Sequence, residues 1–138
     1  MNRKLETVLL LFILICMTLF PYNDVLPEKS VNFINDYFNY DDIINVYKTS
    51  EFYEVTFNDD IVIHFDLDGY WQEVSGNSSP IPINFIDKKV LNTVKKTNPN
   101  AAIIKIKKRW NMYVISLDNY INIFIDFAGM LIGQKVPD

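Results

Sequence analysis

The feature that most constrains this chain is an ungapped internal repeat. When each position is compared with the position 60 residues later, ten pairs between residues 29 and 129 are identical. They are Lys29/Lys89, Asn32/Asn92, Ile43/Ile103, Ile44/Ile104, Lys48/Lys108, Tyr53/Tyr113, Ile61/Ile121, Ile63/Ile123, Asp66/Asp126 and Gly69/Gly129. Many other pairs keep an apolar character, so the two segments also share the spacing of their apolar residues. This pattern predicts two similar structural units.

Local periodicity predicts the content of the first unit. Pro27 suits the first turn of a helix, and apolar residues continue at helical spacing to about Asn39. Four short runs rich in Ile, Val, Phe and Tyr follow, separated by Asn, Asp, Ser and Gly, and such runs predict hairpin-linked strands. The expected strands are residues 43–48, 52–57, 61–66 and 70–75. Their alternating apolar residues predict one face packed against the helix.

The second unit repeats this order. A helix is expected near residues 87–97, ending before Pro99, because the residue before a proline disfavours helix. The expected strands are residues 102–108, 112–117, 120–126 and 130–135. The predicted fold class is therefore α+β, with two tandem α-β-β-β-β repeats over residues 22–79 and 80–138, each with its helix on one face of an antiparallel sheet. Units this small bury little surface alone, so they are expected to share a continuous sheet or to pack as one body.

Residues 1–21 are predicted to be a signal peptide or an N-terminal anchor. Arg3 and Lys4 precede a thirteen-residue apolar stretch, which is short of the roughly 20 residues that span a membrane. A periplasmic or secreted location follows, with an uncleaved membrane anchor as the alternative. Cys16 allows a third form, a lipoprotein, although a small residue normally precedes such a cysteine. Because Cys16 is the only cysteine, the folded part has no disulfide framework and no thiol nucleophile.

Several short motifs resemble a known family. Leu26-Pro27 precedes a helix, Tyr53-Glu54-Val55 lies in a strand, and Phe65-Asp66-x-x-Gly69-x-Trp71 is partly repeated as Ile125-Asp126-x-x-Gly129. Together these resemble the PepSY-like family of putative beta-lactamase-inhibitor-like proteins, over residues 25–135. The resemblance implies an envelope location, no enzyme activity, and protein binding or inhibition. The second unit departs from the pattern, with Ala128 in the turn and Leu131 where the first has Trp71.

The segment from Asp66 to Gly69 resembles the start of a calcium loop. Its twelfth position is Asn77 instead of the required Glu, so a tight turn is the better prediction. The repeat agrees with this interpretation, because the glycine is kept as Gly129 while Asp68 becomes Ala128. A small-ligand or calcium-binding module remains the alternative function, and it would use acidic residues of the first unit. They are Asp59, Asp60, Asp66 and Asp68.

The only histidine is His64, and alternation places it on the sheet face away from the helix. Glu54 or Thr56 on the neighbouring strand could lie close to it. Its counterpart in the second unit is Phe124, so we expect a partly exposed strand residue and not a catalytic one. No catalytic residue, metal site or cofactor is predicted.

The candidates for binding are aromatic residues that the apolar pattern does not assign to the hydrophobic core. Exposed aromatic side chains often mark an interaction surface, and here that surface would be the open sheet face. The candidate binding residues are Tyr47, His64, Trp71, Trp110 and Phe124. The alternative is that the two units bury these aromatics against each other.

Charge is divided unevenly between the units. Residues 26–74 hold 2 basic and 11 acidic residues, whereas residues 81–138 hold 9 basic and 4 acidic ones. The basic cluster from Lys105 to Arg109 would either hold the two units together or steer a charged partner. The predicted function is a non-enzymatic exported envelope protein that binds an unknown protein partner through its open sheet face. Nucleic acid is not expected, and membrane contact is expected only through the N-terminal segment.

Overall fold

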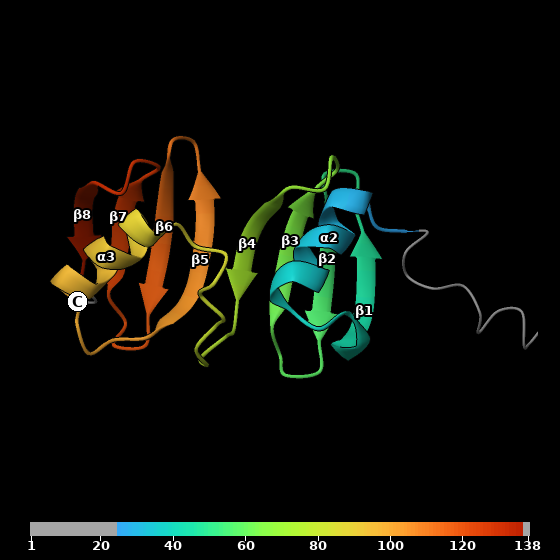
Figure 1. The fold of residues 1–138 in the computed structure, drawn as a ribbon, viewed down its shortest axis with the longest axis horizontal. Coiled ribbons are helices and arrows are strands. Elements are labelled where there is room, and N and C mark those ends of the chain that lie inside the picture. The colour runs from blue at the N-terminus through green and yellow to red at the C-terminus, as the bar shows by residue number, and fades with distance from the viewer. Residues whose placement is uncertain (1–24, 137–138) are drawn as a thin grey trace, which may run out of the picture.

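The computed structural model describes residues 25–136, which form one antiparallel sheet of eight strands with both α-helices on the same face (Figure 1). Strand order in the sheet follows chain order from β1 to β8. The predicted signal peptide or anchor and Cys16 lie outside the described residues. Within the described part of the chain, no helix has the length and apolar character that a membrane span requires.

The first half, residues 25–79, contains one helix, a short 3-10 helix and four strands. These are α2 (Glu28–Tyr37), η2 (Tyr40–Asp42), β1 (Ile43–Lys48), β2 (Phe52–Phe57), β3 (Val62–Asp66) and β4 (Trp71–Ser75). The second half, residues 80–136, has a helix and four strands in the same order. These are α3 (Lys88–Thr97), β5 (Ile103–Arg109), β6 (Met112–Leu117), β7 (Asn122–Asp126) and β8 (Leu131–Lys135). The predicted helices and strands are found within two residues of their expected ends, while η2 was not predicted.

The two halves share one continuous sheet. Strand β4 pairs antiparallel with β5, with Val74 opposite Ile106 and Glu73 opposite Lys107. The linker is tied to β5 by the backbone N–H of Gly76, which donates to the Ile104 carbonyl. Of the two arrangements left open by the sequence, the continuous sheet is the one observed.

The core lies between the helices and the sheet. Ile34 of α2 and Val94 of α3, which lie 60 residues apart in the sequence, are both buried against the strands. In β2, β3, β6 and β7 alternate residues face the helices, as the alternating pattern predicts, whereas register shifts interrupt the alternation in β1, β4, β5 and β8. The buried hydrophobic strand residues are Ile43, Tyr53, Val55, Phe57, Ile63, Phe65, Val74, Ile103, Ile106, Ile115, Leu117, Ile123 and Ile125.

The paired Asp and Gly residues of the repeat form equivalent tight turns that meet the helices. Gly69 and Gly129 have φ values of +92° and +90°, and a Cβ at Gly69 would lie 2.8 Å from the Pro27 Cβ. The Asp66 carboxylate accepts hydrogen bonds from the backbone N–H groups of Asp68 and Tyr70. Asp126 accepts the equivalent bonds in the second half. The turn interpretation is therefore confirmed, and these residues are part of the framework.

Candidate functional site: the open face of the sheet

A single row of cross-strand neighbours runs across the sheet face opposite the helices, which we call the open face. Successive strand pairings place in this row Tyr47, Glu54, His64, Glu73, Lys107, Val114, Phe124 and Gly133. Their neighbours along the strands, such as Val55 and Ile115, are buried under the helices, so alternation points the row the other way. The structure thus brings three of the predicted binding residues onto one surface.

The first half of the open face carries a histidine–glutamate pair. His64 Nε2 lies 2.8 Å from Glu54 Oε2, and these side chains are 30% and 35% exposed. The His64 ring also packs against Phe52 at a centroid distance of 4.8 Å, with the two rings tilted by 33°. The prediction that His64 is a partly exposed strand residue is confirmed, and of the two neighbours considered, Glu54 and Thr56, the contact is with Glu54. Its contacts are those of a cross-strand pair that fixes its ring in place.

At the junction of the halves, one carboxylate holds two lysines. Glu73 of β4 lies 2.7 Å from Lys105 Nζ and 3.0 Å from Lys107 Nζ of β5, and its side chain is only 11% exposed. Partial burial by itself would raise the pKa of the Glu73 carboxyl. The hydrogen bonds and charges of both lysines outweigh that effect and hold its pKa below the ordinary value. Opposite charges therefore join the two halves here, as one interpretation of the charge pattern proposed.

The second half of the open face is hollowed into a groove of about 560 Å³, which we call the open-face groove. Its lining combines cations with apolar side chains, among them Lys105, Lys107, Arg109, Trp110, Met112 and Phe124. Within the described part of the chain, the Arg109 side chain forms neither an ion pair nor a hydrogen bond. The groove therefore offers an uncommitted guanidinium beside an apolar surface.

Trp110 stands out at the edge of this groove. It occupies the two-residue turn between β5 and β6, the residue is 97% exposed, and its φ is +53°. Positive φ is rare for a bulky residue, because its Cβ crowds the backbone. The equivalent residue of the first half is Ser50. The second half thus displays a large aromatic side chain in a costly conformation without burying it.

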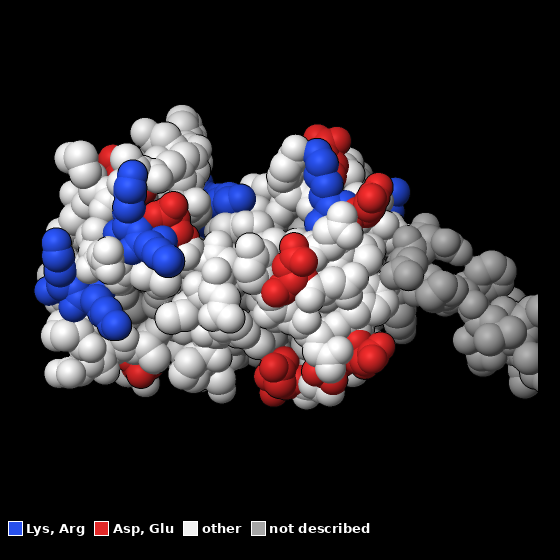
Figure 2. All heavy atoms as spheres, in the orientation of Figure 1, with Lys and Arg blue, Asp and Glu red and all other residues white. Residues whose placement is uncertain are grey.

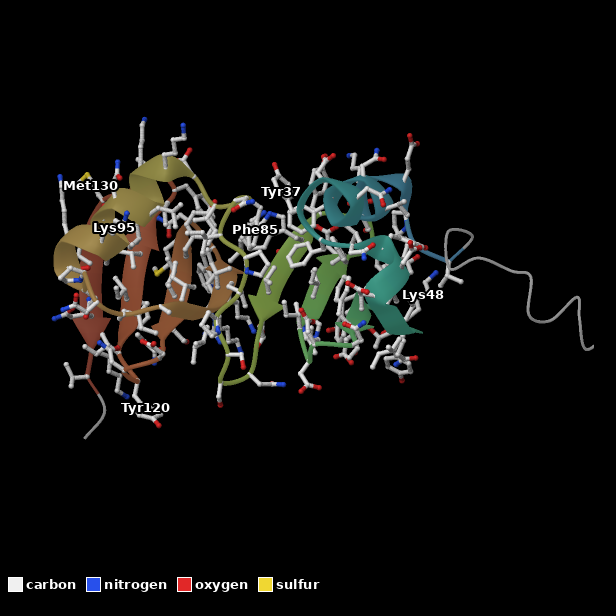
Figure 3. The ribbon with its side chains drawn as sticks, turned by 60° about the horizontal axis from the view of Figure 1, so that its bottom comes forward. Tyr37, Lys48, Phe85, Lys95, Tyr120 and Met130 are labelled. Carbon is white, nitrogen blue, oxygen red and sulfur yellow. The ribbon has the colours of Figure 1, made fainter. Side chains whose placement is uncertain are left out.

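Trp71, another predicted binding residue, does not lie on the open face. It faces the helix side, where its ring stacks on Tyr113 at 6.1 Å and meets Phe85 edge-on at 5.2 Å. Figure 3 shows Phe85 between the halves, near Tyr37 of α2. Lys108 Nζ lies 3.9 Å from the Trp71 ring centroid. Partial burial there lowers the pKa of Lys108. Trp71 thus fills the junction between the halves, as the alternative interpretation held for such aromatics.

A β-bulge explains why alternation misplaces Trp71. His64 pairs with Glu73 while Phe65 pairs with Trp71, so Gln72 is an extra residue in β4. The extra residue turns Trp71 to the side of Phe65, which is fully buried. The bulge leaves no mark in the hydrophobic pattern, because it depends on the register of the neighbouring strand. The two remaining candidates of the second half, Trp110 and Phe124, both line the open-face groove.

The four acids of the calcium alternative do not come together. Asp59 and Asp60 lie in the turn before β3, whereas Asp66 and Asp68 lie at and beyond its far end. A strand of this length separates the two pairs by roughly 13 Å. Among residues 25–136 there is no group of three or more His, Cys, Asp or Glu side chains able to hold a metal ion. These residues do not form a shared calcium site.

Sequence reasoning missed how the basic cluster divides. Lys105, Lys107 and Arg109 line the open-face groove, while Lys108 lies on the helix side against Trp71. The signal was present in the two-residue spacing of these three cations, which places them on one face of a strand. Met112 and Val114 also line the groove and were not singled out. They could not be recognised as groove residues from the sequence, because apolar strand residues are normally assigned to the core.

An eight-stranded antiparallel sheet with helices on one face and a hollowed, exposed opposite face defines an α+β protein of open-sheet architecture. The sequence profile described as "Putative beta-lactamase-inhibitor-like, PepSY-like" matches residues 18–69 and 51–133. The chain therefore belongs to the PepSY-like family. No curated protein matches the sequence.

Solved structures with the same fold come from Bacteroides species. A putative periplasmic protein from Bacteroides vulgatus is 23% identical with a TM-score of 0.71, covering 82% of this chain and 92% of that one. A putative calcium-regulated periplasmic protein from Bacteroides thetaiotaomicron is 24% identical with a TM-score of 0.69, covering 80% and 91%. A further putative periplasmic protein of unknown function from Bacteroides vulgatus is 19% identical with a TM-score of 0.69, covering 80% and 92%. At these identities the likeness shows the fold alone.

Proposed function

We propose that this chain is a non-enzymatic protein of the periplasm that binds another protein through the open-face groove. The observation that carries the proposal is Trp110, which is 97% exposed with a φ of +53° at the edge of the groove. Exposure and positive φ are shared with Tyr120, but only Trp110 lines the groove, where it lies in the lining with Arg109. Tryptophan and arginine are also the side chains that most often dominate the energetics of protein interfaces.

The lining of the groove suggests the chemistry of the partner. Lys105 and Lys107 are partly neutralised by Glu73, whereas Arg109 has no such partner among the described residues. An acidic side chain of the partner would pair with Arg109, and an apolar side chain would pack on Trp110, Met112 and Phe124. The proposed occupant is therefore a protein segment that combines a carboxylate with an apolar anchor. An enzyme inhibited by such contact would be one partner of this kind.

Two further elements complete the proposal. A periplasmic location is supported by the descriptions of the similar structures and by the apolar N-terminal stretch of the sequence. A duplicated unit is supported by the ten identical pairs and by the shared order of helix and strands. On this view both copies share the framework residues, and the second copy alone carries the binding groove.

The test compares capture of envelope proteins by matched variants. Trp110→Ala removes the proposed anchor, while Tyr120→Ala removes another aromatic that is 78% exposed, has a φ of +68° and does not line the groove. Chemical cross-linking in periplasmic extract, followed by mass spectrometry, should give a partner retained by wild type and Tyr120→Ala and lost with Trp110→Ala. Identical partner sets for all three proteins would refute the groove as the binding surface.

A further inference from the structure

A second groove, of about 460 Å³, lies on the helix side of the second half, away from the open face. It is bounded by α3, by linker residues 80–83 and by the segment that leads into β5; we call it the α3 groove. Its volume falls in the range of roughly 300–1,000 Å³ that is usual for small-molecule sites.

The floor of the α3 groove is apolar and comes from the core itself. Ile81, Val94 and Ile103 line it and are each between 5% and 6% exposed. Ile83, which is 43% exposed, lies at its mouth, and Leu91 of α3 forms part of its wall. Apolar surface reaching solvent in a concave site is the usual mark of a ligand with an apolar part.

The first half is built differently at the equivalent place. Its residues Tyr40, Asp41 and Asp42 form η2, and Tyr40 packs against the core. The equivalent residues of the second half are Asn100, Ala101 and Ala102, of which both alanines line the groove. Short side chains have therefore replaced larger ones at the wall of the α3 groove.

The charge of the site differs between the halves as well. Lys88 and Lys95 line the groove, whereas their equivalents are Glu28 and Asn35. No acidic residue lines the groove, and neither lysine forms an ion pair with another described residue. The two lysines are seven residues apart, so they share one face of α3. Figure 2, which views the molecule from the helix side, shows basic side chains gathered on the half that carries α3. Figure 3 labels Lys95 on this helix.

We propose that the α3 groove binds a monomeric single-chain carboxylate amphiphile, of the fatty-acid class. The apolar chain lies on Ile81, Val94 and Ile103, and the carboxylate pairs with the ammonium group of Lys88 or Lys95. The short side chains of Ala101 and Ala102 occur in this groove together with the two lysines, which form no ion pair with another described residue. A carboxylate amphiphile would place its chain in the space that the alanines leave and its charge beside a lysine. The site is separate from the open-face groove, so the two proposals stand or fall independently.

The experiment is a calorimetric titration of the purified protein with decanoate, below its micelle-forming concentration, and with 1-decanol as the uncharged analogue. Wild type should bind one decanoate and bind 1-decanol less tightly. Lys88→Gln/Lys95→Gln should weaken decanoate binding by about tenfold, which corresponds to roughly 1.4 kcal/mol. Lys89→Gln/Lys96→Gln makes the same charge change on the same helix outside the groove, so it should bind like wild type. Ala101→Phe should weaken binding by narrowing the groove.

Circular dichroism and thermal melting establish that each variant is folded. If Ala101→Phe does not fold, Ala102→Leu replaces it as the variant that narrows the groove. The proposal is overturned if wild type does not bind decanoate, or if the two double-lysine variants lose equal affinity. It is also overturned if the wall variants bind like wild type. If the protein sediments with phosphatidylglycerol vesicles but does not bind monomeric decanoate, the lysines contact a membrane surface and the proposal is overturned.

Discussion

Removing the charge of Glu73 tests the junction between the two halves most informatively. Hydrogen bonds to charged groups contribute about 1.5–3 kcal/mol each when well buried. The two lysine side chains here are 39% and 41% exposed, so screening by solvent reduces each bond to about 0.5–1 kcal/mol. Glu73→Gln should therefore lower the free energy of unfolding by about 1–2 kcal/mol at pH 7. Urea unfolding followed by circular dichroism measures this difference.

The same variant makes a prediction about pH. Since the folded-state pKa of Glu73 is lowered, its contribution is full above the pKa of an unfolded glutamate, roughly 4.3, and is lost as the pH falls through the folded-state pKa. The gap between wild type and Glu73→Gln should close at acidic pH. The control is Glu51→Gln, because Glu51 is exposed and forms no ion pair with a described residue. Equal stability of Glu73→Gln and wild type at pH 7, or a gap that is the same at pH 7 and at pH 3, would refute the reasoning.

Four further variants test stability and are measured by thermal or urea unfolding. Trp71→Ala should cost about 3 kcal/mol, because it empties the aromatic junction, whereas a loss under about 1 kcal/mol would contradict that role. Gly129→Ala should cost at least about 2 kcal/mol, because its φ is +90° and its Cβ would lie 2.7 Å from the Lys89 Cβ. Gly133→Ala, with no atom within 4 Å of its Cβ, should change stability by less than about 0.5 kcal/mol. Trp110→Gly should stabilise the fold by about 1 kcal/mol, because glycine removes the strain of positive φ, and a destabilised variant would show that the indole contributes to folding.

Much of the fold was predictable because its signals are local. Alternation in β2 and β3 places Tyr53 and Ile63 on the helix side, and the Asp-x-x-Gly turns are fixed by hydrogen bonds within five residues. Comparing the two units also separated framework residues such as Gly69 from variable ones such as His64.

What the sequence did not reveal depends on how strands are registered against one another. Trp71 changes face because of one extra residue at Gln72, which only the pairing with β3 defines. The row from Tyr47 to Gly133 requires seven strand pairings in a particular register. Two separate grooves could not be foreseen either, because apolar residues that line a groove and those that fill a core have the same spacing along a strand.

The proposed protein-binding role of Trp110 is tested most directly by the affinity of Trp110→Gly for the partner that wild type captures. Residue 110 is 97% exposed, so its replacement leaves the core intact, and the strained turn is relieved. We predict at least an approximately tenfold loss of affinity, a change of roughly 1.4 kcal/mol, in a protein that is no less stable than wild type. Wild-type affinity in the glycine variant would contradict the claim that the open-face groove is where this protein binds its partner.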